Sequence, residues 1–379
     1  MNLSRSIRRI LLTATVAFAA CSSDPTATDD GYTYRQPADL SDGLTTSAAQ
    51  DVGIDAARLA DLVQGIRAGE YSDIHSILLY RGDRLVLEEY FEGVKRWDGL
   101  PYEFNAAVLD NVYSVTKSFT SAAIGLAIQD GVIRDVDVPV RDFFPEHEDL
   151  GGPLADGSLT VRHLLTMSAG LDWNELDVPY SDPSNAHQMM NRAPNQIRYV
   201  LERPYVAQPG ERFYYNSGLT HTLGEIVARA TGETLSDYVA ERLFTPLGIQ
   251  DFWWYSYENG LQHAGGGLHM RPRDMLKFGA LYLNDGVWNG TRVMPEGWVG
   301  ASSSKQAPDR EYGYQWWRDS WEKDGTQISG FSAQGLGGQF IFIVPDLDLV
   351  AVFTGNHPQT DMFLPFTLMS DFVLPAVER

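Results

Sequence analysis

Short apolar runs predict strands near both ends of the chain. Residues 75–80 and 84–91 are β-like runs separated by Arg81-Gly82-Asp83, which is typical of a hairpin turn. Residues 339–344 and 349–353 are apolar at nearly every position, as expected for sheet strands buried on both faces. The pattern predicts one sheet built from the two ends of the chain.

Between these strands, apolar residues recur at helical spacing. Residues 113–131 carry an apolar stripe and end at Gly131, a residue favoured at helix C-termini. Further helices are predicted at 160–167, at 219–230, from Thr234 with capping-box spacing to Asp237, from Pro272, and after Asp361. The order of strands, helices and strands predicts an α/β sheet with a helical insertion.

The first residues have the pattern of an export signal. Three arginines precede an apolar run of 11 residues at 10–20, which is shorter than the roughly 20 residues that cross a bilayer. We predict a signal peptide over 1–20 and a flexible tether over 21–50, which is rich in Ser, Thr, Asp, Pro and Ala. The main domain is placed at 51–379. Its α/β part is expected at about 51–112 and 265–379, and its helical insertion at about 113–264.

Cys21 is the one cysteine of the chain, which excludes an intramolecular disulfide and a thiolate metal cluster. It follows Phe18-Ala19-Ala20, and small residues before a cysteine resemble a bacterial lipoprotein cleavage box. Phe18 departs from the usual Leu, Val or Ile, so ordinary signal-peptidase cleavage stays open as the alternative. We expect export to the bacterial periplasm or cell envelope, with Cys21 as the site of a membrane-attaching lipid.

Charge limits the partners of the chain. Fifty acidic residues against 29 basic ones give a net charge of −21, which repels phosphate backbones and anionic membrane surfaces. Nucleic-acid binding is therefore not expected. The eight histidines show no H-E-x-x-H spacing, so neither a metal nor another cofactor is expected.

Ser114-Val115-Thr116-Lys117 is the segment that carries candidate chemistry. If a helix begins at Ser114, Lys117 lies one turn further, about 4.5 Å along the axis and near the same face. A serine hydroxyl needs a base within hydrogen-bond reach, and a lysine of lowered pKa can be that base, whereas arginine stays protonated. The N–H of Ser114 could also stabilise an oxyanion. Taken alone, the tetrapeptide equally fits a helix-capping serine beside an exposed lysine.

Other segments match catalytic motifs less well. Ser302-Ser303-Ser304-Lys305 repeats the spacing, but it lies in a polar run and is predicted to be a loop. Gly330-Phe331-Ser332-Ala333-Gln334 nearly matches the G-x-S-x-G elbow but ends in glutamine and lacks the strand-then-helix context. The pairs Trp253-Trp254 and Trp316-Trp317 either line a substrate pocket or fill the core.

The surroundings of Ser114 resemble a known family. Residues 111–121 are similar to the nucleophile segment of the β-lactamase-related serine hydrolases, which include class C β-lactamases, family VIII esterases, D-aminopeptidases and hydrolases of the 6-aminohexanoate dimer. Signature segments of this family are also matched, in the same order, at 164–173, 209–218, 266–274 and 335–339. The resemblance covers roughly residues 55–375. It implies an α/β fold of the β-lactamase/transpeptidase type, an antiparallel sheet flanked by helices with an inserted helical domain.

The resemblance implies a catalytic tyrosine, for which two residues compete. Tyr214 satisfies the family pattern Tyr-x-Asn literally. The family usually places its tyrosine five residues after the glycine of Pro-Gly and two after an apolar or aromatic residue, so Gly210 and Phe213 select Tyr215. We favour Tyr215, with Ser217 at the position of the family asparagine. A phenol of pKa near 10 acts as a base only where a cation stabilises its phenolate.

The third family element departs from the β-lactamases. Their Lys-Thr-Gly aligns with Ala333-Gln334-Gly335, so the cation that would hold a substrate carboxylate is missing. A backbone N–H near Leu336 can still serve as the second oxyanion donor. This departure disfavours β-lactams and favours other acyl substrates.

The resemblance implies an exported serine hydrolase that cleaves a small ester or amide through an acyl-enzyme. The expected site has Ser114, Lys117 and Tyr215 as catalytic residues, Ser114 and Leu336 as oxyanion donors, and Ser217, Gln334 and Gly335 as substrate-binding residues. One alternative is a penicillin-binding-type peptidase or β-lactamase. A second is a non-catalytic binding module of the same fold.

Overall fold

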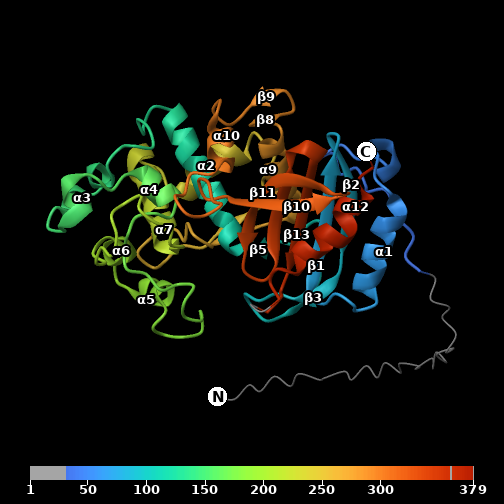
Figure 1. Cartoon of the computed structure of the whole chain (residues 1–379), viewed down its shortest axis with the longest axis horizontal. Coiled ribbons are helices and arrows are strands. Elements are labelled where there is room, and N and C mark those ends of the chain that lie inside the picture. Colours follow the sequence, from blue (N-terminus) through green and yellow to red (C-terminus); the bar gives the residue numbers. More distant parts are fainter. Residues whose placement is uncertain (1–30, 359–360, 379) are drawn as a thin grey trace, which may run out of the picture.

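A six-stranded antiparallel sheet forms the centre of the computed structural model, which describes residues 31–358 and 361–378 (Figure 1). Its strand order is β10-β11-β12-β13-β1-β2. The bounds are β1 Ile74–Arg81, β2 Arg84–Tyr90, β10 Trp317–Lys323, β11 Thr326–Gly335, β12 Gln339–Val344 and β13 Leu349–Gly355. β1 pairs with β13, so the expected sheet built from both ends of the chain is confirmed.

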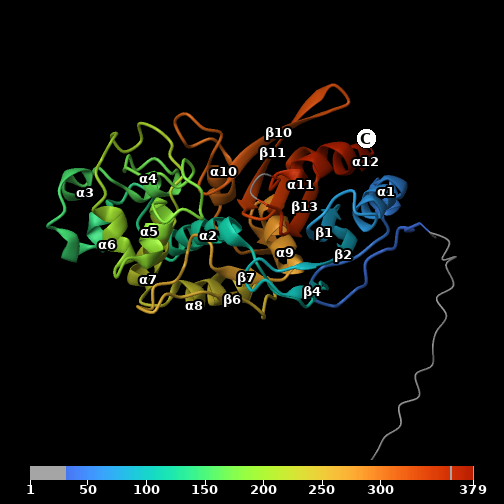
Figure 2. The ribbon, with the colours of Figure 1, turned by 90° about the horizontal axis from the view of Figure 1, so that it is seen from below.

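The central strands of this sheet are buried on both faces. Successive side chains of a strand point to opposite faces, so each strand contributes to two apolar clusters. In β1, Leu78 and Tyr80 join one apolar cluster, and Ile77 and Leu79 join the other. The first cluster includes residues of α9 (Pro272–Leu283). The second includes residues of α1 (Ala56–Arg67) and of the C-terminal helices (Figure 2). These C-terminal helices are α11 Leu364–Leu368, the π-helical turn Met369–Val373, and α12 Leu374–Ala376.

A helical region lies beside one end of the sheet (Figure 1). It contains α2 Thr116–Gln129, α3 Gly152–Asp156, α4 Val161–Leu165, α5 Ala186–Arg192, α6 Gln196–Leu201, α7 Ser217–Thr231, α8 Leu235–Val239 and the π-helical turn Ala240–Phe244. The predicted start at Thr234 is confirmed, since its Oγ1 accepts a hydrogen bond from the Asp237 N–H at 3.1 Å. α2 carries the predicted long helix and is buried along most of its length.

Smaller elements join the two regions. A three-stranded sheet contains β5 Asp110–Asn111, β7 Leu268–Met270 and β6 Trp253–Trp254. Two further pairs are β3 Glu92–Val94 with β4 Pro101–Glu103, and β8 Val287–Trp288 with β9 Thr291–Arg292. Short 3-10 turns span Ala49–Val52, Tyr113–Val115, Val140–Phe143, Pro145–His147 and Pro345–Leu347. In the part of the chain that the structure describes, no helix is both long and apolar enough to cross a bilayer.

The prediction that the second Ser-x-x-Lys segment, residues 302–305, is a loop is wrong for its first two residues. Ser302 and Ser303 are the last two residues of helix α10 (Trp298–Ser303). The buried apolar residues Trp298 and Val299 of this helix precede the polar run. Ser302 is fully buried, and its hydroxyl donates to the Val299 carbonyl at 3.1 Å. This serine is therefore not presented to a substrate.

The predicted tether also needs correction in its described part. Tyr32 donates a hydrogen bond to Glu89 at 2.5 Å, and Tyr34 donates one to the Val86 carbonyl at 2.7 Å. Both rings pack against the apolar cluster under α1. These aromatic side chains hold residues 31–50 on the domain despite the polar composition of the segment. The predicted signal peptide over 1–20 and the predicted lipid site at Cys21 lie outside the described residues.

Candidate active site

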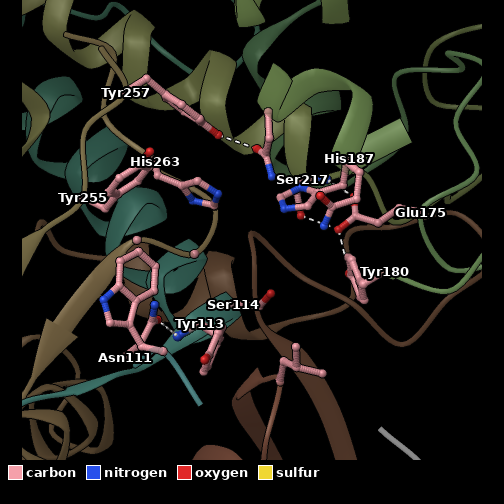
Figure 3. A pocket seen from close by; sticks show the side chains of 17 residues that line it. Asn111, Tyr113, Ser114, Glu175, Tyr180, His187, Ser217, Tyr255, Tyr257 and His263 are labelled. Carbon is pink, nitrogen blue, oxygen red and sulfur yellow. Dashed lines mark hydrogen bonds between the residues drawn. The ribbon is translucent and has the colours of Figure 1, made fainter. Parts of the chain in front are cut away.

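Ser114 lies in a strained turn immediately before α2. The preceding Tyr113 has φ +45°, a left-handed conformation that costs a bulky residue about 1–3 kcal/mol. Its N–H donates to Asn111 Oδ1 at 2.6 Å, and the Val112 N–H donates to the Leu268 carbonyl at 2.9 Å. These bonds from β5 and β7 hold the turn and present the Ser114 hydroxyl to a cavity (Figure 3).

Lys117 is buried directly behind Ser114. Its Nζ lies 2.9 Å from Ser114 Oγ and donates to the Gly265 carbonyl at 2.6 Å. Burial lowers the pKa of Lys117 to about 8, and the negative charge of Glu175 opposes that shift. A lysine in this state has a substantial neutral fraction near neutral pH, so it can accept a proton from the serine.

The structure brings Tyr215, and not Tyr214, to Ser114. The Tyr215 phenol is buried beside the hydroxyls of Ser114 and Ser217, and its ring centroid lies 5.0 Å from Lys117 Nζ. Tyr214 instead donates a hydrogen bond to Asp177. Burial and the charge of Glu175 raise the pKa of Tyr215, so this phenol stays protonated and does not become the phenolate that a basic role would need.

The end of β11 lies against the turn that holds Ser114. A Cβ at Gly335 would lie only 2.4 Å from the Val112 carbonyl and 3.3 Å from the Ser114 nitrogen, so only glycine permits this approach. Leu336 follows and lines the cavity beside Ser114. The Gln334 amide faces the same cavity and donates to Ser332 Oγ at 2.9 Å, while Ala333 is buried in the core.

A buried carboxylate, Glu175, is a site residue that the sequence analysis missed. One of its oxygens accepts hydrogen bonds from Trp173 Nε1 at 2.9 Å and from the Ser217 N–H at 2.7 Å. The other accepts from Tyr180 at 2.8 Å and from Ser217 Oγ at 2.6 Å (Figure 3). Ser217 was expected to bind substrate, but its hydroxyl proton is committed to Glu175.

Glu175 remains charged in this buried position. Burial raises the pKa of its carboxyl, but the electrostatic interactions with His187 and Lys117 and the hydrogen bonds from Ser217 outweigh burial and hold the pKa below its usual value. The site therefore contains one buried negative charge that acts on Lys117 and on Tyr215.

Two cavities meet at Ser114, and Tyr180 and Leu336 line both of them. We call the first, of about 400 Å³, the polar cleft; its lining includes Glu175, His187, Asn191, Tyr255, Tyr257 and His263. We call the second, of about 630 Å³, the apolar cleft; its lining includes Leu176, Tyr215, Trp317, Met362, Phe363 and Phe366. The lining of neither cleft includes a lysine or an arginine among the described residues.

Of the two tryptophan pairs, one residue lines a cavity and two fill the core. Trp317 lines the apolar cleft and stacks on Tyr215, with ring centroids 6.0 Å apart. Trp316 and Trp254 are buried in the core, and Trp253 is 44% exposed. Only one of the four tryptophans therefore lies beside Ser114.

Three histidines, His187, His221 and His263, pack against one another at the polar cleft. Burial lowers the pKa values of His187 and His263, and it lowers that of His221 to about 3. His221 Nδ1 lies 2.8 Å from the Ser217 carbonyl, whereas the Nδ1 atoms of His187 and His263 are buried without a hydrogen-bond partner. Within residues 31–358 and 361–378, no group of three or more His, Cys, Asp or Glu side chains is arranged to hold a metal ion.

Replacing Glu175 by glutamine is expected to shift the pH dependence of catalysis to lower pH. An amide fits the site, because its oxygen can accept from the two N–H donors while its NH₂ group donates to the hydroxyls of Ser217 and Tyr180. Neutral Lys117 is the reactive form, so kcat/KM should rise with pH through an apparent pKa near 8. Loss of the negative charge lowers the pKa of Lys117 further.

The measurement is the pH profile of kcat/KM for both proteins on one ester substrate. Glu311→Gln is the matched control, since Glu311 pairs at the surface with Lys305 and Arg318. An unchanged or upward-shifted profile for Glu175→Gln would show that the carboxylate does not act on Lys117.

Comparison with known proteins places this arrangement in a family. A family model described as Beta-lactamase matches residues 75–371. The 6-aminohexanoate-dimer hydrolase of Paenarthrobacter ureafaciens is 29% identical over 334 residues, which cover 81% of this chain and 78% of the relative. The lovastatin esterase of Penicillium rubens is 30% identical over 161 residues, 38% of either chain.

A solved structure shows the same fold. The octameric penicillin-binding protein homologue from Pyrococcus abyssi superposes with a TM-score of 0.60 at 19% identity, covering 83% of this chain and 77% of that one. The family model spans most of the chain and includes Ser114, Lys117 and Tyr215. The chain therefore belongs to the beta-lactamase family, the β-lactamase-related serine hydrolases.

Proposed function

We propose that this protein hydrolyses small neutral esters or amides through an acyl-enzyme on Ser114. The observation that carries the proposal is the 2.9 Å contact between Ser114 Oγ and Nζ of a buried lysine whose pKa is lowered to about 8. A positioned base of this kind converts a weak hydroxyl into a nucleophile.

The proposed reaction begins when neutral Lys117 takes the proton of Ser114 and the serine oxygen attacks the carbonyl carbon. The N–H groups of Ser114 and Leu336 stabilise the oxyanion. Tyr215 remains a neutral phenol and donates its proton to the leaving oxygen or nitrogen, and the proton held by Lys117 replaces it. Water then cleaves the acyl-enzyme by the same groups acting in reverse.

Two observations favour esters and neutral amides over β-lactams and peptides with a free carboxylate. The described linings of the two clefts offer such a carboxylate no lysine or arginine, and the family's strand lysine is replaced by the buried Ala333. One relative is named as a hydrolase of the 6-aminohexanoate dimer, and another is named as a lovastatin esterase. The presence of Ser114, Lys117 and Tyr215 in contact also disfavours a non-catalytic binding module.

The substrate class is tested by comparing p-nitrophenyl acetate or butyrate with nitrocefin. Loss of a charge-assisted hydrogen bond costs about 1.5–3 kcal/mol, or roughly 10–150-fold in binding, so the short esters should have the higher kcat/KM. Both substrates are measured on one preparation, with Ser114→Ala as the blank. Nitrocefin turning over about tenfold better than the esters would exclude the esterase interpretation.

The two neighbouring tyrosines should differ sharply when each is replaced by phenylalanine. Tyr215→Phe is expected to lower kcat by about 10²–10⁴, the usual contribution of a positioned acid or base. Tyr214→Phe removes only a hydroxyl that contacts Asp177 and should change kcat by less than about tenfold. Steady-state kinetics on p-nitrophenyl acetate decide the ranking, and the opposite order would assign the proton transfer to Tyr214.

We also propose that the protein is exported and that Cys21 carries a lipid, as the N-terminal sequence pattern indicates. Mass spectrometry of the N-terminal peptide from bacterial membranes tests this. A lipidated Cys21 is expected there, and an unmodified N-terminus produced by cleavage elsewhere would exclude the lipoprotein.

A further inference from the structure

The position of Tyr215 divides the substrate between the two clefts. A carbonyl carbon bound to Ser114 has one oxygen, which the proposed oxyanion donors hold, and two remaining substituents, the acyl group and the leaving group. The leaving atom must lie within hydrogen-bond reach of the group that protonates it. Tyr215 lines the apolar cleft and not the polar cleft, so the leaving group belongs in the apolar cleft.

The apolar cleft has the chemistry of a site for a hydrocarbon group. Its wall contains Trp317, Met362 and Phe366, and the amide of Gln334 supplies its polar contact beside Ser114. At its mouth, Leu176 is 56% exposed and Phe363 is 53% exposed. Large apolar side chains gathered at a cavity that no part of the described chain fills are typical of a ligand-binding surface.

The polar cleft offers more hydrogen-bonding groups than the apolar cleft. The phenols of Tyr255 and Tyr257 lie near His263 in its lining, and His187 lies beside Glu175 (Figure 3). A long alkyl chain placed there would lie against polar side chains, among them Gln188 and Asn191, without hydrogen-bonding to them.

We propose that the preferred substrates are esters or amides in which an apolar alcohol or amine, of about six carbons or more, carries a short or polar acyl group. The inference rests on the proposed function and adds the direction in which the substrate binds. The apolar cleft holds the leaving group, and the polar cleft holds the acyl group.

A pair of isomeric esters tests this direction. Hexyl acetate and ethyl hexanoate have the same composition, but the long chain is on the leaving group in the first and on the acyl group in the second. Each buried methylene multiplies binding by about fourfold, so burial of even two of the four additional methylenes favours hexyl acetate by about fifteenfold. We expect kcat/KM for hexyl acetate to exceed that for ethyl hexanoate by about tenfold or more.

A matched pair of variants locates the effect. Leu176→Ser should lower the ratio of kcat/KM for hexyl acetate to that for ethyl acetate by about three- to tenfold. Leu40→Ser is the control, since Leu40 is 50% exposed and lies outside both clefts, and its ratio should equal that of the unmodified protein.

The outcomes separate the inference from the function on which it rests. Equal or faster cleavage of ethyl hexanoate, or an unchanged ratio for Leu176→Ser, overturns the binding direction. Hydrolysis of p-nitrophenyl acetate without hydrolysis of hexyl acetate also overturns it. Absence of any hydrolysis that depends on Ser114 overturns the proposed function as well.

Discussion

Replacing Ser114 by alanine is expected to lower kcat by about 10⁴–10⁶, because removal of a nucleophile that acts as one unit with its base eliminates nearly the whole covalent pathway. The hydroxyl lies 2.9 Å from Lys117 Nζ and beside the Tyr215 phenol, so no neighbouring hydroxyl can substitute for it without moving the turn at Tyr113. A serine-directed fluorophosphonate should label the unmodified protein and not Ser114→Ala.

Peptide mapping of the labelled protein gives the decisive readout. Ser302 and Ser332 belong to the two competing motifs, and both are fully buried. Ser302→Ala and Ser332→Ala are therefore expected to retain labelling at Ser114. A label mapped to Ser302 or Ser332 would contradict the site assignment.

The parts of the fold that could be predicted are those with strong local patterns. β12 and β13 are apolar on both faces because α9 and the C-terminal helices cover the sheet, and α2 is apolar because it lies between the sheet and α7. A buried element carries an apolar pattern within its own sequence, so these strands and this helix could be predicted without knowledge of tertiary contacts.

The strands β10 and β11, at one edge of the sheet, have no such apolar pattern. Most residues of β10 are partly or fully exposed, with Trp321 as its buried residue, because β10 is an edge strand with one neighbour. β11 combines polar residues with glycine, since its end must lie against the Ser114 turn instead of a helix. Their pairing depends on contacts between strands, which the periodicity of one segment does not reveal.

The candidate site also contains a part that local sequence predicts and a part that depends on tertiary contacts. Ser114 and Lys117 are one helical turn apart, so their meeting follows from local geometry. Glu175 reaches Ser217 from 42 residues away, through packing that brings its loop against the start of α7. Because the charge of Glu175 also raises the pKa of Tyr215, the protonation state of this phenol could not be predicted from the sequence.

Replacing Lys117 by arginine is expected to be nearly as damaging as replacing it by alanine, with kcat lowered by about 10²–10⁴ in either variant. Arginine keeps the positive charge but cannot lose its proton, so it cannot accept one from Ser114. The site also has little room for a guanidinium, since Lys117 is 2% exposed and its Nζ is already held by Ser114 and the Gly265 carbonyl.

A matched substitution distinguishes loss of a base from loss of the fold. Lys277 is also fully buried and pairs with Asp274 at 3.2 Å, and it belongs to neither cleft lining, so Lys277→Arg should retain kcat even where its melting temperature falls. Thermal unfolding and kcat are measured for Lys117→Arg, Lys117→Ala and Lys277→Arg. If Lys117→Arg kept more than about a tenth of kcat, a fixed positive charge would suffice, and base catalysis by this lysine would be wrong. Comparable loss of activity in folded Lys117→Arg and Lys117→Ala proteins is the result expected if position 117 must hold an amine that can be neutral.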